Sequence, residues 1–291
     1  MSAQPPGRLI NRRHVRMSGD GPAAVFFEAG IAASSANWLG VQAALQPDTS
    51  SCGYDRPGYG FSPPGDGAIT LMALSDDLRA LMRAIPSRPR PVVVAHSFGT
   101  FIARALAHRY PSEIGGLVLI DPVTDDEWSG PEWRRRIRLR RTVFFAQIAR
   151  GLAAVGLVRL GLWGLLRRGG GNAGPLLGLS PTMRRIAGEV GKLPPEVVDD
   201  LRQQWSDPRF FRTLVAYVRA LPSCARDIAT MPLPLGLPVT VLSGAHQSDR
   251  VLAAHKALAT RHLVVPHTGH WIHLDHPQLV ADKIRALPSN G

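Results

Sequence analysis

Short, almost wholly apolar runs alternate with helical stretches along most of this chain of 291 residues. The clearest of these runs are Ala23–Glu28 (AAVFFE), Pro91–Ala95 (PVVVA), Gly116–Asp121 (GLVLID) and Pro238–Ser243 (PVTVLS). Such runs are too uniformly apolar for a sheet with one face in water, and they fit strands that are buried on both faces. The pattern therefore predicts an α/β protein with a mostly parallel sheet flanked by helices.

The alternation stops between Pro122 and about Pro232 and then resumes. Within this segment the sequence is helical in character, is punctuated by glycine and proline, and has no convincing strand pattern. We therefore expect a core made of residues 1–121 and 233–291, with residues 122–232 inserted as a helical lid.

The inserted segment is strongly basic. The whole chain has 34 basic and 22 acidic residues, a net charge of +12, and residues 122–232 contribute +8 of this charge. A basic surface attracts nucleic acid or anionic membranes. Because no nucleic-acid-binding motif accompanies the charge, we expect no nucleic-acid partner. Two interpretations remain: a solvated, arginine-rich helix face, and transient contact of the lid with anionic membranes.

Cysteine content and apolar runs exclude several protein classes. Cys52 and Cys224 are the only cysteines, too few for a disulfide scaffold or a Cys-rich zinc module. The first residues lack the apolar segment of a signal peptide. The longest apolar stretch, Val143–Leu166, contains Arg150 and Arg159, so it is a poor candidate for a transmembrane helix. We expect a cytoplasmic protein, and the sequence does not indicate its oligomeric state.

The sharpest chemical signal is VVVAHSFGTFIARAL, in which an apolar strand leads into Ser97 and then into a helix. Ala95 and Gly99 provide the small residues that a nucleophile elbow needs two positions either side of its serine, although glycine is usual at the first of them. The elbow would lift the Ser97 hydroxyl above the sheet and aim the amide of Phe98 at a developing oxyanion. The alternative is a serine that only caps a helix.

A serine nucleophile needs a base, and four histidines gather near the end of the chain. His267, His270, His273 and His276 lie in VVPHTGHWIHLDHPQLV, between the last strand and the last helix. Periodicity does not distinguish among them. A metal site is the other interpretation, but the cluster offers no helical pair with a distant third ligand, and we expect no metal and no cofactor.

Three segments together resemble the lidded α/β-hydrolases, the superfamily of the epoxide hydrolases and haloalkane dehalogenases. They are AHSFG at 95–99, YDRPGYGFS at 54–62 and GHWIHLDHP at 269–277, and the likeness extends from about residue 8 to 288. The resemblance implies an α/β-hydrolase fold with an inserted lid. It also implies that His270 is the base, because His270 follows a small residue in a pattern like GHxxxxDxP.

The resemblance assigns the second oxyanion donor to the amide that follows a His-Gly motif. Here Ala29 and Gly30 stand in that place, so Ile31 would supply the N–H. A backbone donor does not depend on the side chain, so the missing histidine does not forbid the hole. The signature turn at 54–62 is interpreted as structural, with Asp55 and Arg56 paired to hold it.

The acid of the triad has two candidates. The usual family position is the loop after PVTVLS, where Asp249 is the only carboxylate, but it comes later than the family pattern. The alternative is Asp121, at the end of GLVLID and 24 residues after Ser97. Haloalkane dehalogenases that carry their acid after this strand look similar in this interval. We favour Asp121, which otherwise would cap the first turn of the lid.

The residues thus predict a serine hydrolase that acts on an apolar, ester-type small molecule through Ser97, His270 and Asp121. Epoxide-hydrolase and dehalogenase chemistry is disfavoured, because those relatives use an aspartate nucleophile. Two alternatives stay open: a non-catalytic ligand-binding protein of the same fold, and a lipid-surface hydrolase with a basic lid. Thioesters, lactones, amides and C–C bonds also stay open as substrates.

Overall fold

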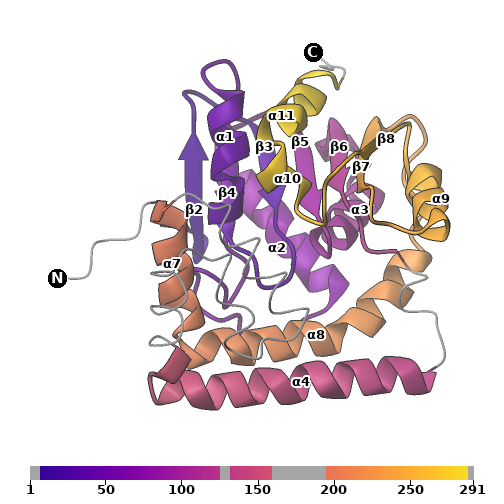
Figure 1. Ribbon diagram of the computed structural model, residues 1–291. Coiled ribbons are helices and arrows are strands. Elements are labelled where there is room, and N and C mark those ends of the chain that lie inside the picture. Colours follow the sequence, from indigo (N-terminus) through magenta and orange to yellow (C-terminus); the bar gives the residue numbers. More distant parts are fainter. Residues whose placement is uncertain (1–6, 125–131, 159–194, 288–291) are drawn as a thin grey trace.

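A computed structural model describes residues 7–124, 132–158 and 195–287, and its core is one eight-stranded sheet (Figure 1). The strands are β1 (Arg8–Ile10), β2 (Arg13–Ser18), β3 (Ala23–Glu28), β4 (Ser51–Tyr54), β5 (Ser87–His96), β6 (Gly116–Ile120), β7 (Val239–Gly244) and β8 (Arg261–Val265). Their spatial order is β1-β2-β4-β3-β5-β6-β7-β8. β2 is antiparallel to both of its neighbours and all other pairs are parallel, which confirms the predicted fold class.

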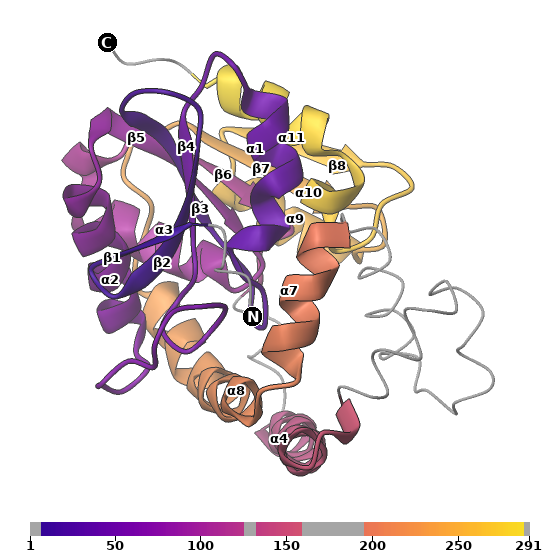
Figure 2. The ribbon, with the colours of Figure 1, turned by 90° about the vertical axis from the view of Figure 1, so that its left-hand side faces the viewer.

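Helices cover both faces of the sheet (Figure 2). The described helices are α1 (Leu39–Leu45), α2 (Leu71–Ala84), α3 (Gly99–Arg109), α4 (Glu132–Ala154), α7 (Pro195–Trp205), α8 (Pro208–Ala229), α9 (Asp249–Leu258), α10 (Ile272–Asp275) and α11 (Pro277–Arg285), with short 3₁₀ helices at Ser35–Trp38 and Pro111–Glu113. α2 and α3 lie on one face, and α1, α10 and α11 lie on the other.

Alternation along each strand divides the apolar residues between two cores. Phe26 and Val93 point into the core under α2 and α3. Their neighbours Phe27 and Val94 point into the core under α1, α10 and α11. Because successive strand residues face opposite sides, a strand covered on both faces must be apolar throughout. This explains the uniform runs in the sequence.

Strand β5 is longer than the sequence predicts, and the helical segment after β3 is in two parts. β5 begins at Ser87 rather than at Pro91, because Ser87 pairs with Ala23 beyond an irregularity in the ladder. Its first residues are polar and mostly exposed, so they carry no apolar signal. The helical segment after β3 is divided into a 3₁₀ turn that ends at Trp38 and an α-helix that starts at Leu39.

The segment predicted as a lid contributes only helices among its described residues. α4 and α8 pack side by side along the lower edge of the molecule in Figure 1, and α7 stands beside them. Residues 125–131 and 159–194 of the predicted lid lie outside the described residues. Within the described part of the chain, no helix combines the length and apolar character needed to cross a membrane.

Candidate active site

Ser97 lies on a tight turn between β5 and α3. Its φ of +52° falls in the left-handed region, which residues other than glycine seldom adopt. Its amide donates to the carbonyl of Ile120 at 3.0 Å, so the turn is tied to the end of β6. Gly99 is required by space, since a Cβ there would lie 2.6 Å from the carbonyl oxygen of Ala29. This geometry is that of a nucleophile elbow.

A hydrogen bond joins Asp121, which follows β6, to His270, which lies in the loop after β8. His270 Nδ1 lies 2.6 Å from Asp121 Oδ2. The carboxylate is fully buried, whereas the imidazole is 26% exposed. The sequence candidates Asp121 and His270 are therefore brought together, although they are far apart in the chain.

The end of β7 and the loop after it donate two hydrogen bonds to Asp121. The backbone amide of Gly244 donates to Asp121 Oδ1 at 3.0 Å, and the side-chain amide of Gln247 donates to Oδ2 at 2.8 Å. Burial opposes ionisation of Asp121, but these donors and His270 outweigh it and keep the pKa of the carboxyl below its usual value. Asp249 is exposed in the first turn of α9, after the N-cap Ser248.

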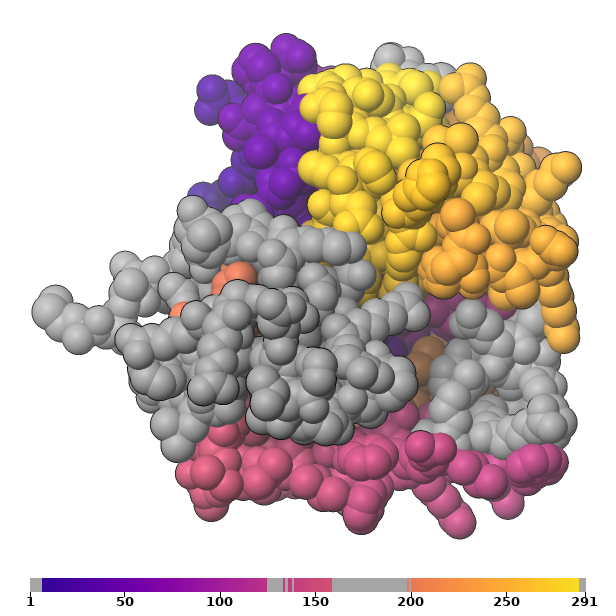
Figure 3. Space-filling model, in the orientation of Figure 1, coloured from indigo at the N-terminus to yellow at the C-terminus, as the bar shows by residue number. Residues whose placement is uncertain are grey.

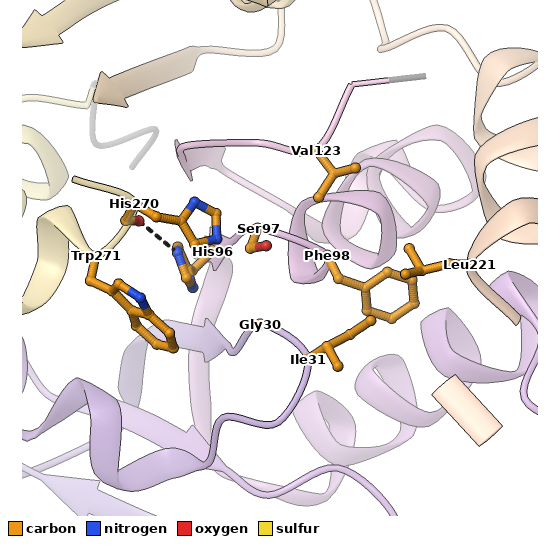
Figure 4. Close-up of a pocket in the computed structure, with 9 residues that line it drawn as sticks. All are labelled: Gly30, Ile31, His96, Ser97, Phe98, Val123, Leu221, His270 and Trp271. Carbon is orange, nitrogen blue, oxygen red and sulfur yellow. Dashed lines mark hydrogen bonds between the residues drawn. The ribbon is translucent and has the colours of Figure 1, made fainter. Parts of the chain in front are cut away.

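Ser97 and His270 line one pocket (Figure 4). In Figure 4 the ring nitrogen of His270 that is not used by Asp121 faces Ser97. No hydrogen bond joins Ser97 to His270 among the described residues, and such bonds are often long before substrate binds. The remaining lining residues are Gly30, Ile31, His96, Phe98, Val123, Leu221 and Trp271.

The other histidines of the C-terminal cluster lie elsewhere. His267 and His276 are exposed. His273 is buried, with its ring centroid 4.6 Å from that of Trp38 and 4.5 Å from that of His96. His96 Nε2 lies 2.9 Å from the carbonyl of His270 and so donates to it. His96, which is not part of the C-terminal cluster, lines the pocket together with His270, whereas His267, His273 and His276 do not.

The buried His273 makes stability depend on pH. Burial, with a smaller contribution from His270, lowers the pKa of His273 to about 3. In the unfolded chain the pKa returns to about 6.5. Between that pH and about pH 3, only the unfolded state binds this proton. The free energy of unfolding then falls as the pH falls, by about 1.4 kcal/mol per pH unit for one such group.

We therefore expect His273→Phe to reduce the acid sensitivity of the fold. Between pH 6.5 and 4.5, urea unfolding of the wild type is expected to lose about 2–3 kcal/mol more than unfolding of the variant. Phenylalanine suits the site, because the His273 ring packs at a tilt of 31° against Trp38 and its Nδ1 has no hydrogen-bond partner. Equal losses in the two proteins would mean that His273 is protonated in the folded state.

The residues predicted as oxyanion donors, Ile31 and Phe98, both line the pocket beside Ser97. Ile31 follows the turn at Ala29 and Gly30, directly after β3. A side chain at Gly30 would be crowded, since a Cβ would lie 3.0 Å from His96 Nδ1 and 3.3 Å from Ser97 Cβ. The turn therefore passes close to the serine.

Arg56 lies beneath this turn, and sequence reasoning missed its position. Its guanidinium donates to the carbonyls of both Ala29 and Gly30, and it forms a buried ion pair with Glu28 at 2.5 Å. Burial opposes the charge on Arg56, but Glu28 outweighs it and the pKa of the guanidinium rises. Tyr54 also donates to Glu28.

The expected pairing of Asp55 with Arg56 is wrong. Asp55 contacts His14 Nδ1 at 2.8 Å and accepts from the Ser35 amide at 2.7 Å. These contacts satisfy the Asp55 carboxylate without Arg56, so Arg56 pairs with Glu28 instead. Local sequence did not show this pairing, because Glu28 ends β3 and Arg56 follows β4, and only the parallel pairing of these two strands brings them together.

Metal binding finds no support in the described part of the chain. No group of three or more His, Cys, Asp or Glu residues there is placed to hold an ion.

Comparison with known proteins relates the chain to hydrolases. A model of the alpha/beta hydrolase family matches residues 25–283. The Bacillus subtilis protein YqjL is 31% identical over 102 residues, which cover 35% of this chain and 40% of that protein. The Mycobacterium tuberculosis protein Rv2715 is 26% identical over 282 residues, which cover 93% of this chain and 76% of that protein. The 2-(acetamidomethylene)succinate hydrolase of Mesorhizobium japonicum is 29% identical over 108 residues, which cover 37% of this chain and 38% of that enzyme.

Solved structures agree with the fold. The epoxide hydrolase CorEH without ligand superposes with a TM-score of 0.69 over 94% of both chains, at 18% sequence identity. A deep-sea metagenome alpha/beta hydrolase, MGS-M2, gives a TM-score of 0.65 at 14% identity, over 94% of this chain and 93% of that one. At such identities the likeness establishes the fold alone.

Proposed function

The chain belongs to the alpha/beta hydrolase family, and from that premise we propose that it is a serine hydrolase that cleaves carboxylic-ester-type bonds. The observation that carries the proposal is the hydrogen bond between His270 and Asp121, with the free ring nitrogen of His270 facing Ser97. Likeness to the hydrolase of Mesorhizobium japonicum supports hydrolytic chemistry. The substrate in the name of that enzyme is not carried over to this chain.

Each residue has a defined role in the proposed mechanism. Ser97 Oγ attacks the substrate carbonyl while His270 Nε2 takes the hydroxyl proton. Asp121 stabilises the imidazolium, and the amides of Ile31 and Phe98 donate to the oxyanion. His270 then gives the proton to the leaving alcohol, which produces an acyl-enzyme. Water, activated by His270, releases the acid and restores Ser97.

The pocket favours an apolar acyl or alcohol group. Ile31, Phe98, Val123, Leu221 and Trp271 provide its side-chain walls, and none of them carries a charge. Leu221 belongs to α8, so the segment that we propose as a lid contributes directly to the pocket. Apolar walls with a few convergent polar groups are typical of small-molecule sites.

Two assays test the proposal. A fluorophosphonate probe is expected to label Ser97, with the labelled residue identified by peptide mass spectrometry. A series of p-nitrophenyl esters of increasing chain length is expected to show the highest kcat/KM for a medium apolar acyl chain. A folded protein that neither reacts with the probe nor hydrolyses any ester would favour the alternative, a ligand-binding protein of this fold.

Arg56 is expected to act on the oxyanion hole through one peptide group. The Gly30 carbonyl that accepts from Arg56 and the Ile31 N–H belong to the same planar trans peptide, so they point in opposite directions. A cation on the oxygen therefore fixes the N–H toward the pocket and polarises it. Arg56 does not contact the pocket itself, and we class it as a positioning residue.

We predict that the double variant Glu28→Gln/Arg56→Met lowers kcat by about 10–100-fold with a smaller change in KM, since an oxyanion donor is worth about 10²–10³ when lost outright. Replacing both partners avoids leaving Glu28 as an unpaired buried charge. Glu28→Gln alone is the matched control, because Arg56 then keeps both carbonyls. If the single and double variants have the same kcat, Arg56 has no role in positioning Ile31.

A further inference from the structure

α4 exposes an unusual concentration of large apolar side chains. Eleven large hydrophobic residues are exposed in the described part of the chain, and eight of them lie between residues 133 and 157. Six of them belong to α4 and two follow it directly: Trp133, Ile137, Phe144, Phe145, Ile148 and Leu152 on the helix, and Val155 and Leu157 after it. Contiguous exposed apolar surface of this kind marks an interaction site rather than ordinary protein surface.

The exposed residues of α4 lie opposite the face that packs on the protein. Ala146 and Ala153, seven residues apart, are buried where α4 meets α8. Ile137, Phe144 and Ile148 follow a spacing of seven and four, which places them on one side of the helix, about half a turn from the two alanines. In Figures 1 and 3 α4 forms the lower rim of the molecule, so this face points away from the body.

Positive charge accompanies the apolar face. α4 contains seven arginines and one acidic residue, Glu132. Arg140 and Arg141 are exposed, and helical spacing places both of them beside Ile137, Phe144 and Ile148. A partner for this face must therefore be both apolar and negatively charged. A second copy of the chain meets only the first condition, because its own α4 would bring the same arginines into the contact.

We propose that α4 docks flat on the surface of an anionic lipid membrane. Ile137, Phe144, Ile148 and Leu152 would enter the boundary between headgroups and acyl chains, while the arginines contact lipid phosphates. Surface-lying helices combine an apolar face that includes aromatic residues with arginines or lysines on their flanks. α4 has 23 residues and lies against α8 along its length, so it is suited to lie on a membrane rather than to cross it.

Vesicle flotation with the whole protein tests the proposal. We expect binding to vesicles of phosphatidylcholine with 30% phosphatidylglycerol, and little binding to phosphatidylcholine alone. Raising the salt to 0.5 M is expected to weaken binding, because the Debye length then shrinks to a few ångströms. Binding is measured without any substrate, so its outcome is independent of the proposed hydrolase activity.

Variants separate the apolar and the charged contributions. Phe144→Glu/Ile148→Glu is expected to lower the vesicle partition coefficient by about tenfold or more, since two apolar contacts become two repelled charges. Arg140→Gln/Arg141→Gln is expected to reduce both binding and its salt dependence. Leu235→Glu is the matched control, because Leu235 is a fully exposed apolar residue outside α4.

Three results would overturn the proposal. One is an absence of binding to anionic vesicles by the folded wild type. Another is equal binding by the wild type and Phe144→Glu/Ile148→Glu, with circular dichroism showing both folded. The third is a dimer, seen by light scattering, that Phe144→Glu/Ile148→Glu dissociates, which would assign the face to a second copy of the chain.

Discussion

Replacing Ser97 with alanine is expected to lower kcat for a p-nitrophenyl ester by about 10⁴-fold or more. The variant loses only the hydroxyl oxygen that would bond to the acyl group, while His270 and Asp121 keep their hydrogen bond. The fold is expected to persist, because alanine and serine adopt the strained φ of +52° at similar cost. Steady-state kinetics and the thermal unfolding midpoint measure the two effects separately.

Ser243 provides the matched control for this experiment. Its hydroxyl hydrogen-bonds to His255 at 2.7 Å and to His262 at 2.8 Å, so it is a second serine paired with histidine. Ser243 is buried and does not line the pocket. We expect Ser243→Ala to retain fluorophosphonate labelling and Ser97→Ala to lose it. The opposite pattern would move the nucleophile to Ser243 and contradict the proposed mechanism.

The parallel part of the sheet could be predicted from sequence because burial on both faces leaves an unbroken apolar signal. Phe26, Phe27 and Val93 illustrate this, since each is buried in one of two cores on either side of the sheet. The first residues of β5 could not be predicted in the same way. Arg88 and Arg90 are exposed there, in the irregular stretch between the Ser87 pair and the Val92 pair of the ladder.

Candidate site residues differ in how far local sequence reveals them. Ser97 is marked by a local pattern, because the strand, the turn and the helix that position it are consecutive in the chain. Arg56 is not, because its partners Glu28 and Gly30 lie on a neighbouring strand and its turn. The motif around Arg56 indicates a local pairing with Asp55, whereas the contacts are made across the sheet.

The acid illustrates an intermediate case. β5 and β6 are parallel neighbours, so Ser97 and Asp121 must meet at the same sheet edge once both strands are identified. The loop after β7 begins at that edge as well, which is why Asp249 is the rival candidate in the sequence. Sequence alone did not reveal that the Gly244 backbone amide and the Gln247 side-chain amide would donate hydrogen bonds to Asp121.

Asp121→Asn is expected to lower kcat by several orders of magnitude, about 10⁴-fold in comparable triads. We expect the asparagine oxygen to face the backbone amide of Gly244, which donates to Asp121 Oδ1 in the native site and is fixed in place. The side-chain amide of Gln247, which donates to Oδ2, can instead turn its oxygen toward the new NH₂ group. The new NH₂ group then faces His270 Nδ1, so it favours the tautomer that carries its proton on Nε2. That nitrogen can no longer accept the proton of Ser97, and no negative charge remains to stabilise an imidazolium.

Asp249→Asn is the control for this last experiment, because Asp249 is exposed in the first turn of α9 and its replacement leaves the site unchanged. We expect its kcat to stay within about twofold of the wild type, as for surface substitutions generally. Nitrogen-15 chemical shifts of His270 would show the change of tautomer in Asp121→Asn and none in Asp249→Asn. A large loss of kcat in Asp249→Asn, with Asp121→Asn active, would mean that the loop after β7 rearranges to supply the acid during turnover. In that case Asp121 would serve only to hold Gly244 and Gln247, and the nucleophile and base would keep their proposed roles.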